Sequence, residues 1–121
     1  MKIFSCLLIG GIVFFIFCVQ VGCKYDKPII SVCDTTKVTY SGSIIPVLSG
    51  NCTGCHSGPN APNGIAVDNY KAVKSLVNNG MLIGVINHDP GFDFMPKNSP
   101  KLDACSISKI RIWIKNGAQN N

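Results

Sequence analysis

The segment Cys52-Thr53-Gly54-Cys55-His56 constrains the structure of this chain more than any other feature. Two thiols separated by two residues, with a histidine directly after the second, form the attachment pattern of c-type haem. Each thiol can add to one vinyl group of the porphyrin, and the adjoining imidazole can bind the iron as its proximal ligand. The pattern therefore predicts one covalent haem held by Cys52, Cys55 and His56.

Two other uses of a Cys-x-x-Cys pair compete with this interpretation. A thioredoxin-like redox pair normally accompanies alternating strands and helices, and no such alternation is visible here. Half of a zinc site would need a second pair of ligands at suitable spacing. The only other histidine is His88, and the remaining cysteines are scattered singly. Haem attachment is therefore the favoured hypothesis.

Residues 1–22 predict an export signal of the lipoprotein type. A short basic start is followed by residues 3–19, which are almost wholly apolar. A small residue precedes Cys23, as in the lipobox of bacterial lipoproteins, where the cysteine is acylated and becomes the mature N-terminus. Gln20 departs from that motif, which prefers an aliphatic residue there. An uncleaved membrane anchor and a plainly secreted form stay open, and all three export the domain.

The remaining chain predicts one small domain behind a tether. Residues 23–37 are polar, contain one proline and have few core-forming residues, so they are expected to be the tether. Residues 38–121 are long enough for one modest core, which is marginal alone and would benefit from a covalent staple. A haem is a large apolar group against which such a core can pack.

The seven cysteines divide by position. Two leave with the signal, one is expected to take lipid and two to take haem, so Cys33 and Cys105 remain. In an oxidising compartment two such cysteines suggest a disulfide. A bridge between positions 72 apart would restrict the unfolded chain by on the order of 4 kcal/mol in the chain-entropy model. Two unpaired thiols are the alternative.

The charge balance argues against one class of partner. Lys and Arg total 11 against 6 acidic residues, which gives a net charge of +5. Because no run of basic residues is present, nucleic-acid binding is not supported. A solvated, mildly basic surface is the simplest interpretation, and steering toward an acidic redox partner is the sharper one.

Periodicity and capping residues predict three or four short helices. Ser43 is a candidate N-cap, with Pro46 tolerated in the first turn of a helix that runs into Cys52. Asp68 is the candidate N-cap of a second helix. That helix carries Tyr70, Val73, Leu76 and Val77 at helical spacing and stops at Asn78-Asn79-Gly80.

The rest of the chain predicts one more helix and two loops. Residues 81–86 are apolar but too few for periodicity to distinguish helix from strand. Ser106 or Ser108 is expected to cap a last helix with Trp113 on its apolar face, Lys115 in its last turn and Gly117 as its stop. Residues 57–64 and 88–100 are loops by their glycine and proline content.

A second axial ligand would decide between electron carrier and catalyst. Met95 lies 39 residues after the proximal histidine in a loop followed by proline, and its soft thioether would favour Fe(II) and raise the potential. Phe92 and Phe94 could shield the iron from water. His88 would instead give bis-histidine ligation, Met81 is expected to pack in the core, and an open sixth position stays a further alternative.

Four segments carry a resemblance to a known family. They are Asn51–Ser57, Gly64–Tyr70, Phe94–Lys97 and Ile110–Ala118. Together they resemble a small bacterial c-type cytochrome, most closely the planctomycete-type cytochrome c branch, here as a stand-alone lipoprotein. The resemblance covers roughly residues 38–118. It implies a mostly α cytochrome c fold, with three to four short helices around one covalent haem.

The resemblance also implies the roles of the site residues. Cys52 and Cys55 would be thioether attachments, His56 the proximal ligand and Met95 the distal ligand. The leading hypothesis is a single-haem electron carrier rather than an enzyme, anchored through lipid on Cys23 and facing the periplasm of a bacterial envelope. Its partners would be redox proteins of that envelope. A peroxidase-type haem enzyme and a haem-bearing subunit of a larger oxidoreductase are the alternatives.

Overall fold

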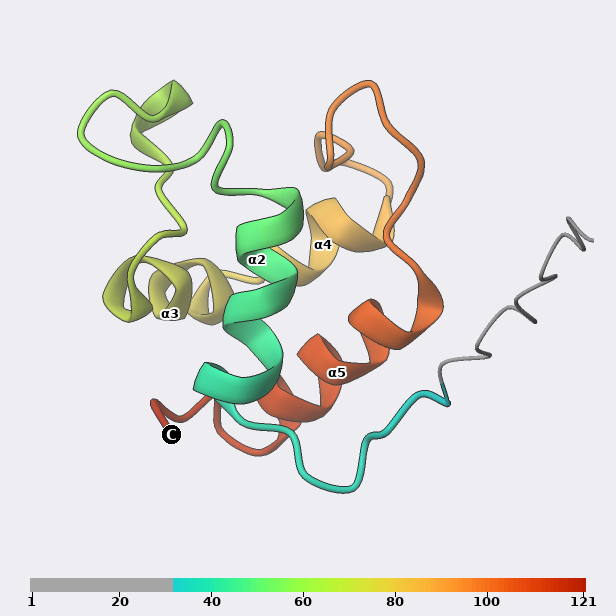
Figure 1. Ribbon diagram of the computed structural model, residues 1–121. Helices are drawn as coiled ribbons and strands as arrows, with labels where there is room; N and C mark the ends of the chain where they lie inside the picture. Colours follow the sequence, from blue (N-terminus) through green and yellow to red (C-terminus); the bar gives the residue numbers. More distant parts are fainter. Residues whose placement is uncertain (1–31) are drawn as a thin grey trace, which may run out of the picture. The chain divides into compact units, whose positions relative to one another are not determined.

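Every regular element in the described part of the chain is helical. The structure, a computed structural model, describes residues 32–121 and contains no strand there (Figure 1). The prediction of a mostly α fold is confirmed for these residues. The elements are a π-helical turn η2 (Tyr40–Ile44), α2 (Ile45–Asn51), a 3-10 turn η3 (Pro62–Gly64), α3 (Tyr70–Asn78), α4 (Met81–Asn87) and α5 (Ala104–Lys115).

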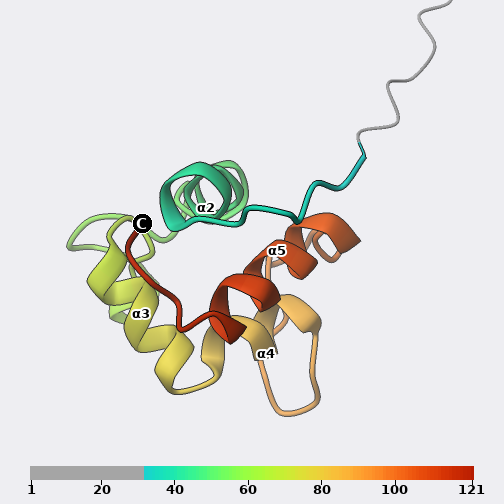
Figure 2. The same cartoon turned by 90° about the horizontal axis from the view of Figure 1, so that it is seen from below.

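Part of the predicted N-terminal organisation falls outside this range. The expected signal, residues 1–22, and the expected lipidation residue Cys23 lie outside the described residues. Among residues 32–121, no helix is long and apolar enough to span a bilayer. The first described residues, 32–39, contain no helix and pass beside α5 before they enter η2 (Figures 1 and 2).

A disulfide joins that first segment to the last helix. Cys33 is bonded to Cys105, and their Cα atoms are 5.5 Å apart, within the usual range of roughly 4.4–6.8 Å. The bond links the residues before η2 to the first turn of α5. The structure therefore brings together the two cysteines that the sequence left without another role, rather than leaving two separate thiols.

The first helix begins earlier than its predicted cap. Thr39 has extended backbone and its hydroxyl accepts a hydrogen bond from the amide of Gly42 at 3.1 Å. The hydroxyl of Ser43 accepts from the amide of Thr39 at 3.3 Å. Ser43 as N-cap was therefore wrong, because it lies inside a turn that Thr39 starts. Pro46 lies in the first turn of α2 as expected, a position at which proline is tolerated.

The middle helices correct one cap and settle one ambiguity. Asn69 caps α3, since its side chain accepts from the amide of Ala72 at 2.9 Å. Asp68 as N-cap was wrong by one residue. The expected stop is present at Gly80, whose φ is 75°. Residues 81–86, which periodicity could not assign, belong to α4, in which Leu82, Gly84 and Ile86 are buried.

The last helix also starts before its predicted caps. Asp103 has extended backbone, and its carboxylate accepts from the amide of Ser106 at 2.9 Å and from the hydroxyl of Ser106 at 2.6 Å. Ser106 and Ser108 as N-caps were therefore wrong, because both lie within α5. Lys115 occupies the last turn and Gly117 has a φ of 90°, so the predicted end of this helix is confirmed.

An aromatic cluster holds the first and last helical elements together. The rings of Tyr40 in η2 and Trp113 in α5 stack with centroids 5.3 Å apart. Tyr70 of α3 meets Tyr40 edge-on at 5.1 Å. Such pairs add about 0.5–1.5 kcal/mol beyond the area they bury. The core around them contains Ile44, Leu48, Val67, Val73, Leu82, Ile86, Leu102, Ile107, Ile110 and Ala118.

Hydrogen bonds from the last residues complete this packing. The side-chain oxygen of Asn121 accepts from the amide of Tyr40 at 2.8 Å, and its backbone oxygen accepts from the amide of Ser41 at 2.9 Å. The hydroxyl of Tyr70 donates to the carbonyl of Ala118 at 2.9 Å. The segment after α5 thus supplies acceptors to amides at the start of η2 that have no partner within the helix.

Candidate haem-attachment site

The predicted attachment segment Cys52–His56, called the pentapeptide below, forms a tight turn at the end of α2. Cys52 is the C-cap of that helix, and its amide donates to the carbonyl of Leu48 at 2.8 Å. Its own carbonyl accepts from the amides of Cys55, at 3.1 Å, and of His56, at 2.9 Å. Because one oxygen receives both donors, the backbone folds back on itself. The three predicted attachment residues are therefore brought together on one turn, which a rigid helix delivers.

Both thiols of the turn are free within the described residues. Cys52 is half-buried and Cys55 is exposed. Burial raises the pKa of the Cys52 thiol above its ordinary value of 9.0. A nucleophilic redox pair of the thioredoxin kind requires a thiol whose pKa is lowered instead. The environment of Cys52, in a fold without strands among these residues, therefore argues against that use.

The hydrogen bond of His56 fixes which ring nitrogen is available. Its Nδ1 atom lies 2.8 Å from the carbonyl oxygen of Ile65. A carbonyl can only accept, so Nδ1 carries the hydrogen and Nε2 presents a lone pair. No hydrogen bond involves Nε2 in the part of the chain that the structure describes. Metal-ligating histidines are usually held in this way, because the second-sphere acceptor sets the tautomer and orients the ring.

The loop that supplies this acceptor is itself held in place. The amide of Val67 donates to the carbonyl of His56 at 2.8 Å. The carboxylate of Asp68 accepts from the amide of Gly58 at 2.6 Å and from the Asn69 side chain at 3.0 Å. These bonds lower the pKa of Asp68, that from Gly58 most strongly. Asp68, predicted as a helix cap, instead braces the loop that orients His56.

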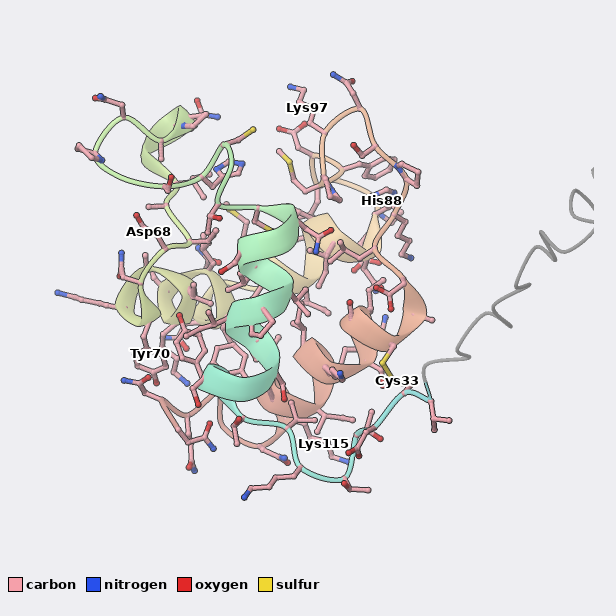
Figure 3. The ribbon with its side chains drawn as sticks, viewed as in Figure 1. Cys33, Asp68, Tyr70, His88, Lys97 and Lys115 are labelled. Atoms are coloured by element: carbon pink, nitrogen blue, oxygen red, sulfur yellow. A yellow bond between two sulfur atoms is a disulfide. The ribbon has the colours of Figure 1, made fainter. Side chains whose placement is uncertain are left out.

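The Met95 segment lies on the same side of the domain as the attachment turn, toward the C-terminal end of α2. Figure 1 shows the loop after α2 and the loop between α4 and α5 both extending beyond that end. In Figure 3, Lys97 lies at this end and Lys115 at the opposite one. Met95 is half-buried, and its amide donates to the carbonyl of Val85 at 3.1 Å. No hydrogen bond joins the two loops among residues 32–121.

His88 contacts the Met95 segment. Its Nε2 atom lies 3.1 Å from the carbonyl oxygen of Met95, so this nitrogen carries the hydrogen and donates. The ring stacks on Phe94 with centroids 4.6 Å apart and planes 7° from parallel. Nε2 is therefore engaged, while Nδ1 keeps its lone pair. These contacts attach His88 to the backbone and to the Phe94 ring of the Met95 segment.

A glycine permits the aromatic packing under this segment. A Cβ atom on Gly84 of α4 would lie 2.6–2.7 Å from ring carbons of Phe92, closer than real contacts allow. Phe92 is 37% exposed and Phe94 is 54% exposed. The two rings therefore present apolar surface close to Met95 in the chain.

A pocket of about 280 Å³ lies elsewhere, beside α2 and the residues that lead into α3. It does not include the sulfur-bearing or imidazole side chains of the predicted site. The pocket is lined by Tyr40, Ile45, Leu48, Ser49, Thr53, Val67, Asp68, Asn69 and Tyr70.

Within residues 32–121, no three His, Cys, Asp or Glu side chains lie close enough to share a metal ion. The partners needed to complete a zinc site are thus missing from this part of the chain.

Three features of the site could not be predicted from the residue types in the sequence. The acceptor for His56 is a backbone carbonyl, that of Ile65, and any residue there would supply one. The role of Asp68 and the contact of His88 with Met95 depend on how two loops fold. The histidine, asparagine and aspartate content of those loops was the only available hint.

Comparison with known proteins adds no assignment, since no protein-family model, curated protein or solved structure matches this chain.

Proposed function

We propose that this chain is a single-haem c-type cytochrome that carries electrons in a bacterial cell envelope. The observation that carries the proposal is the state of the pentapeptide. Two free thiols and an imidazole with an available Nε2 lie together on one turn. This donor set fits haem c, which needs two thiols for attachment and a neutral imidazole nitrogen for the iron.

Each of the proposed site residues has a distinct role. Cys52 and Cys55 would hold the haem through thioether bonds, and His56 would bind iron through Nε2. Met95 would provide the sulfur of the second axial position, and Phe94 would exclude water beside it. When bound, the haem supplies an iron that accepts and donates one electron. The chain's contribution is to fix the ligands so that little rearranges when the charge of the iron changes.

The helical architecture supports a cytochrome c fold as part of this proposal. The stack of Tyr40 on Trp113 joins the first and last helical elements of the described residues. The haem would then lie at the end of the domain where the two loops extend. The Cys33–Cys105 bridge supports an oxidising compartment, which agrees with export and with a lipid on Cys23. Redox proteins of the envelope would be the electron donors and acceptors.

The proposal is preferred to a haem enzyme of the peroxidase type. Such an enzyme needs an open iron position and a nearby acid–base group, and His88 is the obvious distal residue. Its Nε2 hydrogen is engaged by the carbonyl of Met95. A Met95 thioether in the sixth position would also close the iron to such chemistry.

An absorption spectrum tests the proposed ligand set. The chain is produced with a cytochrome c maturation system, and the oxidised protein is compared with Met95→Ala. The proposal predicts a low-spin spectrum with a methionine–iron charge-transfer band at long wavelength, and the loss of that band in the variant. Met81→Ala serves as a control and retains the band. Persistence of the band in Met95→Ala would remove Met95 from the role.

A further inference from the structure

Both backbone groups of Met95 are fastened to the end of α4. The amide donates to Val85 at 3.1 Å, and the carbonyl accepts from Nε2 of His88 at 3.1 Å. His88 is the C-cap of α4 and has left-handed backbone, with φ 55° and ψ 43°. A residue with a Cβ adopts that conformation at a cost of roughly 1–2 kcal/mol. The contacts of its side chain must therefore compensate for that cost.

The end of α4 is in turn tied to the last helix. The guanidinium of Arg111 in α5 donates to the side-chain oxygen of Asn87 at 2.7 Å. The amide group of Asn87 donates to the carboxylate of Asp89 at 3.1 Å. His88 lies between these two residues, so its backbone is anchored on both sides. The side chain that donates to Met95 therefore comes from a backbone position that its two neighbours hold in place.

The ring of His88 makes a second contact with the same segment. It stacks on Phe94, directly before Met95, at 4.6 Å. Phe94 is 54% exposed, and this stack is the aromatic pair that it forms among the described residues. Figure 3 shows His88 beside the loop that carries Lys97. One side chain thus holds two successive residues of the loop, one by its backbone and the other by its ring.

We infer that His88 is a positioning residue, which holds the Met95 segment in place by its hydrogen bond to the Met95 carbonyl and its stack on Phe94, so that the thioether would be ready to bind the iron. The inference rests on the proposed function, because it takes Met95 as the second axial ligand. A thioether is a weak ligand, so its occupancy depends on how much freedom the loop loses when the sulfur binds. A loop already fixed at Met95 loses less, and competing ligands then enter more slowly.

Two substitutions separate the hydrogen bond from the stack. His88→Gln retains a side-chain N–H donor and loses the ring, whereas His88→Phe retains a ring and loses the donor. Neither residue favours left-handed backbone, so the strain at this position is similar in both variants. Comparing each variant with the wild type therefore tests one of the two contacts.

The rate of carbon monoxide binding to the reduced, haem-loaded protein measures how readily the sulfur leaves. We expect His88→Phe to bind carbon monoxide about fivefold faster than the wild type, the ratio for one hydrogen bond of ordinary strength. Its long-wavelength methionine–iron band should weaken. His88→Gln should also bind carbon monoxide faster than the wild type, because it loses the stack on Phe94. Equal rates and equal bands in the wild type and His88→Phe would overturn the role of the hydrogen bond, and a wild-type rate in both variants would overturn the inference.

Hydrogen exchange at the Met95 amide of the haem-loaded protein gives a second readout, which does not depend on a competing ligand. We expect the Met95 amide to exchange more slowly in the wild type than in His88→Phe, because the loop opens more often in the variant. Unchanged exchange would overturn the positioning role. A wild-type chain that acquires no covalent haem would overturn the proposed function and, with it, the role of His88 toward the iron. A loaded protein that fails only the carbon monoxide comparison overturns the role of His88 alone.

Discussion

His56 donates its Nδ1 hydrogen to the carbonyl oxygen of Ile65 across 2.8 Å. This bond joins the end of the attachment turn to the far side of the loop that follows it. It leaves Nε2 with a lone pair, because a neutral imidazole carries one hydrogen. The proposed iron ligand is thus prepared by a backbone atom nine residues away.

The two histidines are expected to be opposite tautomers. His56 should carry its hydrogen on Nδ1, and His88, which donates to Met95 through Nε2, should carry it there. Nitrogen chemical shifts of the two imidazoles in the haem-free chain, recorded at a pH where both are neutral, distinguish these forms. Nε2–H on His56 would contradict the arrangement of the site.

Removing the Cys33–Cys105 bond should destabilise the domain strongly. The bond closes a separation of 72 residues, so Cys33→Ser/Cys105→Ser should lower the free energy of unfolding by on the order of 4 kcal/mol in the chain-entropy model. Denaturant unfolding of the haem-free chain measures the change. The double variant is also the control for the effect of the reductant. Reduction should lower the denaturant midpoint of the wild type and leave the midpoint of the variant unchanged. A wild type insensitive to reductant would show that the bond contributes little.

Stability should fall on acidification as braced carboxylates become protonated. Hydrogen bonds from Gly58 to Asp68 and from Ser106 to Asp103 lower the pKa of each carboxyl below its ordinary 3.8. A group with a lowered folded-state pKa contributes stability above its unfolded pKa and loses it as pH falls through the folded-state value. Denaturant midpoints measured down through that range should decline, and the decline should be shallower in Asp68→Asn. An equal slope in Asp68→Asn would mean that Asp68 does not hold the loop.

A methyl group at Gly84 should disturb the aromatic packing under Met95. The added Cβ would approach the Phe92 ring to 2.6–2.7 Å, and overpacking of this kind costs about 1–3 kcal/mol. Gly84→Ala should therefore lower the unfolding free energy by that amount. In a Phe92→Ala background the same substitution should cost much less, because the clashing ring is gone. Equal costs in the two backgrounds would show that the ring moves aside freely.

Most helices could be predicted from sequence because their apolar faces repeat at helical spacing. The residues that begin them could not, and Asn69 and Asp103 replaced the neighbouring candidates. An N-cap must have extended backbone, and the path of the preceding chain decides which of several polar residues adopts it. Residues 81–86 stayed ambiguous, since six apolar residues match a strand or a helix equally well.

The site divides in the same way between local and non-local information. The pentapeptide is contiguous, so its spacing alone predicted that Cys52, Cys55 and His56 share one turn. The contact of His88 with Met95 spans seven residues, and it forms only because α4 ends in a left-handed residue. No sequence pattern specifies that contact. From the sequence His88 could therefore be considered as an iron ligand, but its hydrogen bond to the Met95 carbonyl could not be predicted.

The mass of the protein matured in a cell envelope tests the central claim most directly. Produced with a cytochrome c maturation system, the denatured chain should carry the added mass of one haem, and the Cys52→Ala/Cys55→Ala variant should lack it. A Soret band should accompany the added mass. A wild-type chain that folds with intact maturation machinery, yet stays colourless and shows the mass of polypeptide and lipid alone, would contradict the account.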